Sequence, residues 1–359
     1  MHDYIKKNKK NIKVARNKNL LNSAVFIDGQ AGCGKTLLNA IVASLNKVEI
    51  LNYATEVENL CILKNLNKID DDAVQSMIKI QMDNVLYETM MSRRVNFRIS
   101  DLSSAFNDTK VLTYINRLFE KGDELVPKKI QKLKPILHFA VHNLLPVSKP
   151  LFLSLKNKVK FIEVVRHPLY MIIQQTLNHM NLAKINGSAR QFRIYLEINK
   201  KNIPFTSLSF YKDYFKLKPV ERAILEMHNF SYLSEKFKKE NSKIIKNLIT
   251  IPFEDFVLEP KPYINKISKL LKTDPSSKTK EVMRLQKIPR KKVSDGIPLD
   301  IYKRCGWKPP IKNINEREEL IKRRDFVIQQ KANNYYVDLL DKLSEKYEKK
   351  YINNKSYKI

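Results

Sequence analysis

Short apolar runs alternate with amphipathic stretches along most of the chain. The runs at residues 24–27, 48–51, 135–141, 158–165 and 248–253 predict buried strands. Apolar positions recur at helical spacing over residues 37–45, 70–91, 111–119, 125–133, 169–182 and 261–271, and residues 317–347 predict one long, charged terminal helix. Residues 191–198 and 205–210 are compatible with a hairpin. This alternation predicts an α/β fold with a doubly wound, mostly parallel sheet flanked by helices.

The expected organisation is one elaborated domain with an extension at each end, since 359 residues suffice for a large single core. We expect a basic extension over residues 1–20 and the α/β domain over residues 21–312. Within it, a helical insertion is expected at about 70–133 and a hairpin insertion at about 185–215. Residues 313–359 are expected to form a charged helix packed on or beside the domain.

The first apolar run leads into the most informative stretch of the chain, Gly29-Gln30-Ala31-Gly32-Cys33-Gly34-Lys35-Thr36. It matches the P-loop pattern G-x-x-x-x-G-K-[ST], between a predicted strand and a predicted helix. The glycines let backbone N–H groups surround a phosphate at the positive end of the helix. Lys35 adds a full charge, and the Thr36 hydroxyl can donate to an oxygen or ligate a metal. We expect these eight residues to bind a phosphate-like group; an ordinary glycine-rich helix cap is the alternative.

Two further polar residues follow directly after predicted strands, His142 after residues 135–141 and Arg166 after residues 158–165. In doubly wound sheets the working residues lie beyond the carboxyl ends of the strands, so both are expected beside the loop. His142 is a candidate general base, with a hydrogen-bonding strand cap as the alternative. Arg166 can pair with a second phosphate, with a salt bridge to a neighbouring helix as the alternative. His138 and His167 are expected to be buried or structural.

A nucleotide hydrolase or kinase also needs an acid that holds magnesium at the end of a second strand. Asp28 precedes the loop itself, Glu163 lies inside a predicted strand, and Glu254 and Asp255 follow a run interrupted by proline. Asp338 falls in the terminal helix. The strand that would end in the acid ends instead in Arg166, which suits a second phosphate. We therefore predict no metal site.

Composition and net charge say more about where the protein works than about the reaction it carries out. Lys and Arg number 67 against 37 Asp and Glu, a net charge of +30 that attracts anions. The lysines are spread along the chain, and a compositional bias toward Lys, Asn and Ile accounts for them equally well. Cys33, Cys61 and Cys305 are too few and scattered for a disulfide framework or a zinc site. With no long apolar run and no signal-peptide pattern, a cytoplasmic location is expected.

Four segments, in order, resemble the sulfotransferase family, whose members transfer a sulfuryl group from 3′-phosphoadenosine 5′-phosphosulfate (PAPS). Residues 29–36 are similar to the 5′-phosphosulfate loop, and residues 136–146 to the segment with the catalytic histidine, here His142. Residues 161–168 are similar to the strand and Arg-x-Pro element that binds the 3′-phosphate, here with Arg166. Residues 251–260 are similar to a late Glu-Asp-Phe and proline element. The resemblance spans roughly residues 21–310.

The resemblance implies PAPS as co-substrate, a hydroxyl-bearing acceptor with glycans among the candidates, His142 as base and Lys35 as the group that stabilises the leaving phosphate. It also implies that Gln174 stands where a serine commonly contacts the 3′-phosphate. Ala140 occupies the place of a frequent lysine, and Arg290-Lys291-Lys292 or Lys303-Arg304 replace the usual Arg-Lys-Gly. Trp307 is a candidate to stack on a ring or to anchor a loop.

Two other function classes stay open. The complete Gly-Lys-Thr favours a P-loop kinase or NTPase, which the missing metal acid disfavours. The net charge allows a protein that binds nucleic acid or acidic glycans without catalysis. Arg93, Arg94 and Arg98 form a basic loop that suits an acidic or hydroxyl-rich acceptor, or is simply solvated.

Overall fold

The computed structural model describes residues 11–101, 103–122, 124–184, 194–293 and 314–352. Its centre is a parallel sheet in the order β2-β3-β1-β4-β7. The strands are β1 (Ser23–Asp28), β2 (Val48–Tyr53), β3 (Ile136–Ala140), β4 (Val159–Val165) and β7 (Leu248–Pro252). Each of the five apolar runs forms one of these strands. The predicted α/β class with a parallel, doubly wound sheet is thus confirmed.

The sheet is buried on both faces, as a parallel sheet requires. Along β1 the side chains alternate: Val25 and Ile27 enter one apolar cluster, and Ala24 and Phe26 enter the other. Phe26 stacks on Phe139 of β3, with ring centroids 5.0 Å apart. Because successive side chains of a strand point to opposite faces, one short apolar run supplies both layers of the core.

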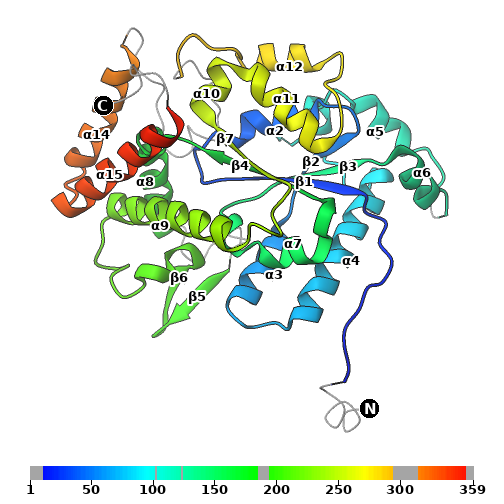
Figure 1. The fold of residues 1–359 in the computed structure, drawn as a ribbon, viewed down its shortest axis with the longest axis horizontal. Helices are drawn as coiled ribbons and strands as arrows, with labels where there is room; N and C mark the ends of the chain where they lie inside the picture. Colours follow the sequence, from blue (N-terminus) through cyan, green and yellow to red (C-terminus); the bar gives the residue numbers. More distant parts are fainter. Residues whose placement is uncertain (1–10, 102, 123, 185–193, 294–313, 353–359) are drawn as a thin grey trace.

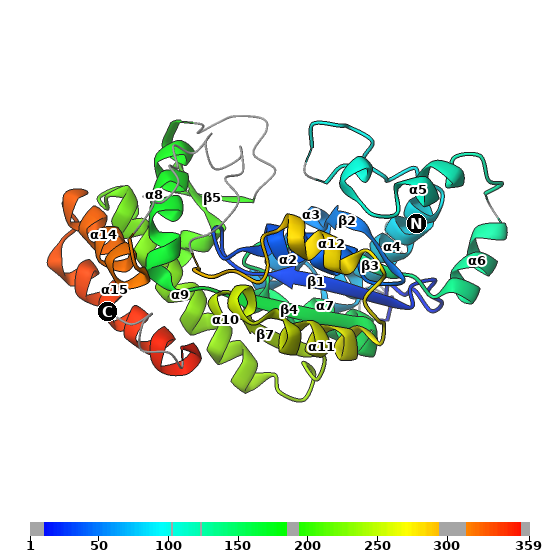
Figure 2. The same ribbon diagram turned by 90° about the horizontal axis from the view of Figure 1, so that it is seen from above.

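Helices cover each face (Figures 1 and 2). The cluster with Val25 is completed by α2 (Lys35–Ala43), α8 (Pro168–Lys184), α9 (Pro219–Glu240), α10 (Phe253–Leu258), α11 (Pro260–Leu271) and α12 (Thr279–Leu285). The cluster with Phe26 is completed by α3 (Thr55–Asn65), α4 (Asp71–Met90), α6 (Leu125–Leu133) and α7 (Lys149–Leu155). Helix α5 (Val111–Arg117) packs through Tyr114 on Ile50 of β2. Among the described helices, none is both long enough and apolar enough to cross a membrane.

The prediction of a single terminal helix over residues 317–347 is wrong, because the chain forms two helices there. These are α14 (Glu316–Gln329) and α15 (Asn334–Tyr351). Between them Lys331 adopts φ 55°, which ends α14, and the Asn333 side chain accepts the Tyr335 N–H at 3.0 Å, which begins α15. Arg324 pairs with Asp341 across the two helices at 2.6 Å. The pair forms a helical hairpin that packs on α8 and α9.

The predicted hairpin is present, but its second strand lies earlier than expected. Strands β5 (Tyr195–Ile198) and β6 (Lys201–Pro204) are antiparallel. Asn199 and Lys200 connect them with φ of 51° and 62°, the two positive values that a type I′ turn needs. Residues 205–210, predicted as the second strand, form a 3₁₀ helix instead. Residues 191–193 of the predicted first strand lie outside the described residues.

The described part of the basic N-terminal extension is held on helix α4. The Asp83 carboxylate, which is 3% exposed, pairs with Arg16 at 2.6 Å and accepts the backbone N–H groups of Leu20 and Leu21. Asp72 accepts the N–H of Val14 at 2.7 Å. These contacts fix the chain immediately before β1.

Candidate functional site

The loop at residues 29–36 has a backbone that demands glycine. Gly34 caps the N-terminus of α2 with φ 96°, and Gly32 has φ 88°, both in the left-handed region. A Cβ on Gly34 would lie 2.1 Å from the Phe253 ring, so any side chain there would displace that ring. Helix α2 therefore begins directly at the loop, which places the positive end of the helix there.

Side chains from α8 and from the end of β4 hold this loop from outside. Arg166 donates from Nη1 to the carbonyl of Gly32 at 2.8 Å, and Gln175 donates to the carbonyl of Ala31 at 2.8 Å. Gln174 lies so close to Gly32 that a Cβ there would be 2.9 Å from its Oε1. The structure thus brings the predicted residues Arg166 and Gln174 to the loop.

The remaining loop residues differ in what they offer a ligand. Gln30 donates to the carbonyl of Glu226 at 3.3 Å, which ties the loop to α9. The thiol of Cys33 is buried, and burial raises its pKa, so this residue contributes backbone only. Thr36 is exposed on the first turn of α2. The ammonium of Lys35 is buried and donates to the carbonyls of Gly29 and Val141, the latter at 2.7 Å.

Arg166 occupies an aromatic and ionic environment beside the loop. Its guanidinium lies 4.3 Å from the Phe253 ring centroid and 5.2 Å from that of Tyr170. Its Nε is 3.9 Å from Glu254 Oε1, at the outer limit of an ion pair. Arg290 lies on the same Phe253 ring, 5.5 Å from its centroid. Of the basic residues proposed near the C-terminus, Arg290 therefore lies beside Arg166; Lys303, Arg304 and Trp307 lie outside the described residues.

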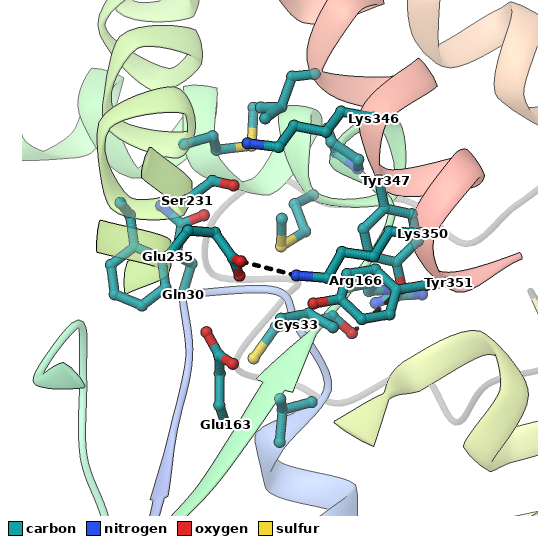
Figure 3. A pocket seen from close by; sticks show the side chains of 17 residues that line it. Gln30, Cys33, Glu163, Arg166, Ser231, Glu235, Lys346, Tyr347, Lys350 and Tyr351 are labelled. Atoms are coloured by element: carbon teal, nitrogen blue, oxygen red, sulfur yellow. Dashed lines mark hydrogen bonds and ion pairs between the residues drawn. The ribbon is translucent and has the colours of Figure 1, made fainter. Parts of the chain in front are cut away.

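The C-terminal helix α15 supports Arg166 through Glu254, a contact that sequence reasoning missed. The Tyr347 hydroxyl donates to Glu254 Oε2, and the N–H of His167 donates to Glu254 Oε1 at 3.0 Å. Burial, with the Glu254 charge, raises the pKa of Tyr347, so its hydroxyl keeps the proton that it donates. Figure 3 shows the cavity that Arg166 and Tyr347 line, in which Lys350 of α15 pairs with Glu235 of α9 at 2.8 Å.

The carboxylates near the loop that sequence reasoning weighed as metal ligands have protein partners. Asp28 accepts the N–H groups of Leu144 and Leu145 at 3.1 and 2.7 Å. Glu163 accepts from Lys238 at 2.9 Å and from Thr250 at 2.6 Å. Within the described ranges, no group of three or more His, Cys, Asp or Glu side chains has a metal-binding arrangement.

His142 lies in the loop after β3, and its side chain is 48% exposed. Its backbone N–H donates to Glu58 Oε1 at 2.6 Å, and its Nδ1 is 3.5 Å from the same oxygen. His142 lines a cavity together with Ala31 of the glycine-rich loop and Gln175 of α8. The predicted base and the predicted phosphate loop thus border one cavity.

The other two histidines weighed from the sequence are buried and internally bonded, as predicted. His138 Nε2 is 2.8 Å from Asn39 Oδ1 in the core. Burial, reinforced by the Lys110 charge, lowers the pKa of His138 to about 3. His167 Nε2 is 3.0 Å from Glu348 of α15. Neither ring faces the cavity that His142 lines.

Comparison with known proteins gives matches in structure only. No family model and no curated protein matches the sequence. The sulfotransferase domain from the curacin biosynthetic pathway has a TM-score of 0.39 at 12% identity, covering 88% of this chain and 99% of its own. The sulfotransferase domain of the Synechococcus PCC 7002 olefin synthase has a TM-score of 0.37 at 12% sequence identity, and the match covers 88% of this chain and 97% of that domain. Sulfotransferase STF9 from Mycobacterium avium has a TM-score of 0.35 at 12% sequence identity, and the match covers 79% of this chain and 71% of that protein. Such distant likenesses say nothing about the chemistry of the site.

Asp28→Asn should destabilise the fold, because the amide group would turn one N–H donor toward a backbone N–H. We expect the free energy of unfolding to fall by about 1–3 kcal/mol, the cost of leaving a buried donor unpaired. Urea unfolding at pH 7 measures it. The control is Asp213→Asn, whose side chain is 61% exposed and which should change stability by less than about 0.5 kcal/mol. Equal effects of the two substitutions would show that the Asp28 contact is not structural.

The low pKa of His138 predicts sensitivity to acid. The unfolded chain takes up a proton near pH 6.5, whereas the folded chain takes it up only near pH 3, so stability is lost as the pH falls between these values. His138→Gln keeps a donor for Asn39 and removes this titration. Between pH 7 and pH 5 the variant should therefore lose less stability than the wild type, measured by urea midpoints. An identical loss in both proteins would contradict the assignment.

Proposed function

We propose that this protein is a sulfotransferase that moves a sulfuryl group from PAPS to a hydroxyl acceptor. The observation that carries the proposal is the direct contact of Arg166 with the glycine-rich loop at Gly32, beside the cavity in which His142 lies. A loop for one phosphate, a cation for a second and a candidate base therefore gather at the carboxyl ends of β1, β3 and β4.

The residues present fit a bisphosphorylated nucleotide. The N–H groups of residues 29–36, with Lys35 and Thr36, would hold the 5′-phosphosulfate. Arg166, with Arg290 at the same Phe253 ring, would hold the 3′-phosphate, with Gln174 beside it. Guanidinium groups suit this role because they bind phosphate through two parallel hydrogen bonds. PAPS, when bound, supplies a sulfuryl group on a phosphate leaving group.

The chain's own groups then have separate tasks. Lys35 and the N–H groups of the loop stabilise the negative charge that develops on the leaving phosphate, a kind of contact worth about 2.7–4 kcal/mol when one donor is removed. His142 accepts the proton of the acceptor hydroxyl. Glu58, 3.5 Å from His142 Nδ1, orients the ring so that Nε2 is the nitrogen that takes the proton.

A P-loop kinase or NTPase is the second candidate, because the motif ends in a complete Gly-Lys-Thr. That reaction requires a carboxylate beside the magnesium ion. In the described chain, Asp28, Glu163 and Glu254 are engaged by backbone N–H groups, Lys238 and Tyr347. Dependence of nucleotide binding on magnesium separates the two candidates.

Arg166→Ala should weaken the binding of 3′-phosphoadenosine 5′-phosphate. Titration calorimetry in the presence of EDTA should show binding to the wild type, and a Kd raised about tenfold to a hundredfold in the variant, the range for a charged hydrogen bond. Arg324→Ala is the matched control, since Arg324 pairs with Asp341 between α14 and α15, and it should leave Kd unchanged. Binding of ATP or GTP only with magnesium, and none of the bisphosphate, would overturn the proposal in favour of a kinase.

His142→Gln should retain nucleotide binding and lose turnover. With PAPS and a panel of phenols, alkanols and sugars, mass spectrometry should show sulfation falling by about 10²–10⁴ in rate, the usual contribution of a general base. His228→Gln on α9 is the control, because His228 does not line the cavity. Unchanged turnover in His142→Gln would remove this residue from the mechanism.

A further inference from the structure

Lysines gather at the amino-terminal edge of the central sheet, opposite the candidate site. Five segments that lead into strands or end beside them lie there, residues 46–47, 132–134, 156–160, 243–247 and 272–274. They carry one carboxylate, Asp274, and nine lysines, namely Lys47, Lys132, Lys134, Lys156, Lys158, Lys160, Lys243, Lys246 and Lys272. At the other edge, the residues that follow β2 and β7 include the carboxylates of Glu56, Glu58, Glu254 and Asp255. The positive charge of the molecule is therefore in excess at one edge of the sheet.

Hydrogen bonds join these segments to one another and to the sheet. Carbonyls of residues 46–47 accept from the N–H of Ile136 at 2.8 Å and from the Thr273 hydroxyl at 2.6 Å. The Asn247 amide donates to the Asn157 carbonyl at 3.2 Å. Neighbouring strands lie about 4.8 Å apart, so the edge of the five strands is about 19 Å long. Lysines precede β2, β3, β4 and β7, and they therefore form a row along this edge.

The lysines of this row lack the ion pairs that neutralise other lysines of the molecule. Within the described residues, none of the nine pairs with a carboxylate, whereas Lys64, Lys129 and Lys238 do. Burial, and after it the charge of Lys272, lowers the pKa of Lys160. The positive charge at this edge is therefore available to an external anion.

We propose that the amino-terminal edge of the sheet binds the phosphate backbone of double-stranded nucleic acid without reading its base sequence. A duplex carries one charge per about 1.7 Å of its axis, so an edge of about 19 Å faces about eleven phosphates. Lysine ammonium groups bind phosphates as point charges. The five segments contain no arginine, the side chain that most often reads guanine. This activity goes beyond the proposed function and does not depend on it.

Two other polyanions fit these segments less well. Single strands are bound through aromatic side chains that stack on the bases, and the five segments contain no aromatic residue. Proteins that bind a bilayer surface also insert apolar side chains into it. Leu133, 43% exposed, is the one large apolar side chain that these segments expose. A duplex backbone requires charge alone, and is therefore the partner that fits best.

The test is fluorescence anisotropy of a labelled DNA duplex of about 20 base pairs, titrated with the full-length protein between about 50 and 200 mM NaCl. Each lysine that contacts a phosphate adds about 0.9 to the slope of log K against log salt. Lys134→Asn combined with Lys272→Asn should therefore lower that slope by about 1.8. Both lysines are exposed and end helices in the left-handed conformation, which asparagine also adopts, so the fold should be kept.

The matched control is Lys200→Asn combined with Lys331→Asn. It removes the same charge from two exposed positions that also have positive φ, 62° and 55°, and that lie away from this edge. The control should leave the slope unchanged. An equal fall of the slope in both double variants would show that net charge alone attracts the duplex, and would overturn the proposal. Absence of duplex binding at about 50 mM NaCl would overturn it as well.

Competitors distinguish the other partners and the other site. A single strand of the same length and vesicles that contain phosphatidylserine are titrated in parallel, and tighter binding of either than of the duplex would refute the proposal. Added 3′-phosphoadenosine 5′-phosphate should not displace the duplex, because the candidate site lies at the opposite edge of the sheet. Displacement would place the duplex at the glycine-rich loop and contradict the proposal. A wild type that binds the duplex but not the bisphosphate supports this surface and refutes the sulfotransferase alone.

Discussion

The site depends on one buried carboxylate, that of Asp28, which accepts the N–H groups of Leu144 and Leu145 at the end of β1. Asp28 is fully buried, and a buried polar side chain costs free energy unless it is hydrogen-bonded. Its backbone leads directly into Gly29, and its partners follow His142 by two and three residues. These two hydrogen bonds, together with the parallel pairing of β1 and β3, therefore hold the glycine-rich loop next to the segment that carries the candidate base.

A second layer of contacts holds the loop in the same way, by pairing charge with backbone. Arg166 donates to the Gly32 carbonyl and lies near the Glu254 carboxylate. Glu254 in turn accepts a hydrogen bond from the Tyr347 hydroxyl. The large net positive charge of the chain does not appear here as a bare basic surface. Lys35, Lys238 and Lys350 have carbonyl or carboxylate partners in the described structure. The net charge favours the approach of anions in general, whereas the local pairing decides where one is held.

The sequence predicts the sheet well because each strand is a continuous apolar run, a pattern that survives without knowledge of its neighbours. The glycine-rich loop is contiguous in the sequence, and His142 and Arg166 come within two residues of the ends of β3 and β4, so their positions at this edge of the sheet could be predicted, whereas their roles stay predictions. The break between α14 and α15 was not predicted, since Lys331 and Asn333 interrupt no hydrophobic pattern. The second strand of the hairpin was misplaced because the apolar residues 205–210 resemble a strand and fold as a 3₁₀ helix.

The pairing of His179 with Glu226, like that of Tyr347 with Glu254, could not be predicted for a different reason. Each pair joins helices that are far apart in the sequence, and the pattern of apolar and polar residues within one helix does not indicate which helix it will contact. Single polar residues on amphipathic helices carry a signal only once the packing of α8, α9 and α15 is known. The parts of the candidate site that consist of contiguous residues can therefore be predicted from the sequence, whereas contacts that depend on how the helices pack cannot.

The support that α15 gives to Arg166 has a consequence for how the protein is made. The glycine-rich loop precedes Tyr347 and Glu348, which contact Glu254 and His167, by most of the described chain. During synthesis, β1, β3 and β4 are therefore made before the residues of α15 that hold Glu254 next to Arg166. The final position of Arg166 against the glycine-rich loop thus depends on the docking of a helix that is synthesised after the whole central sheet.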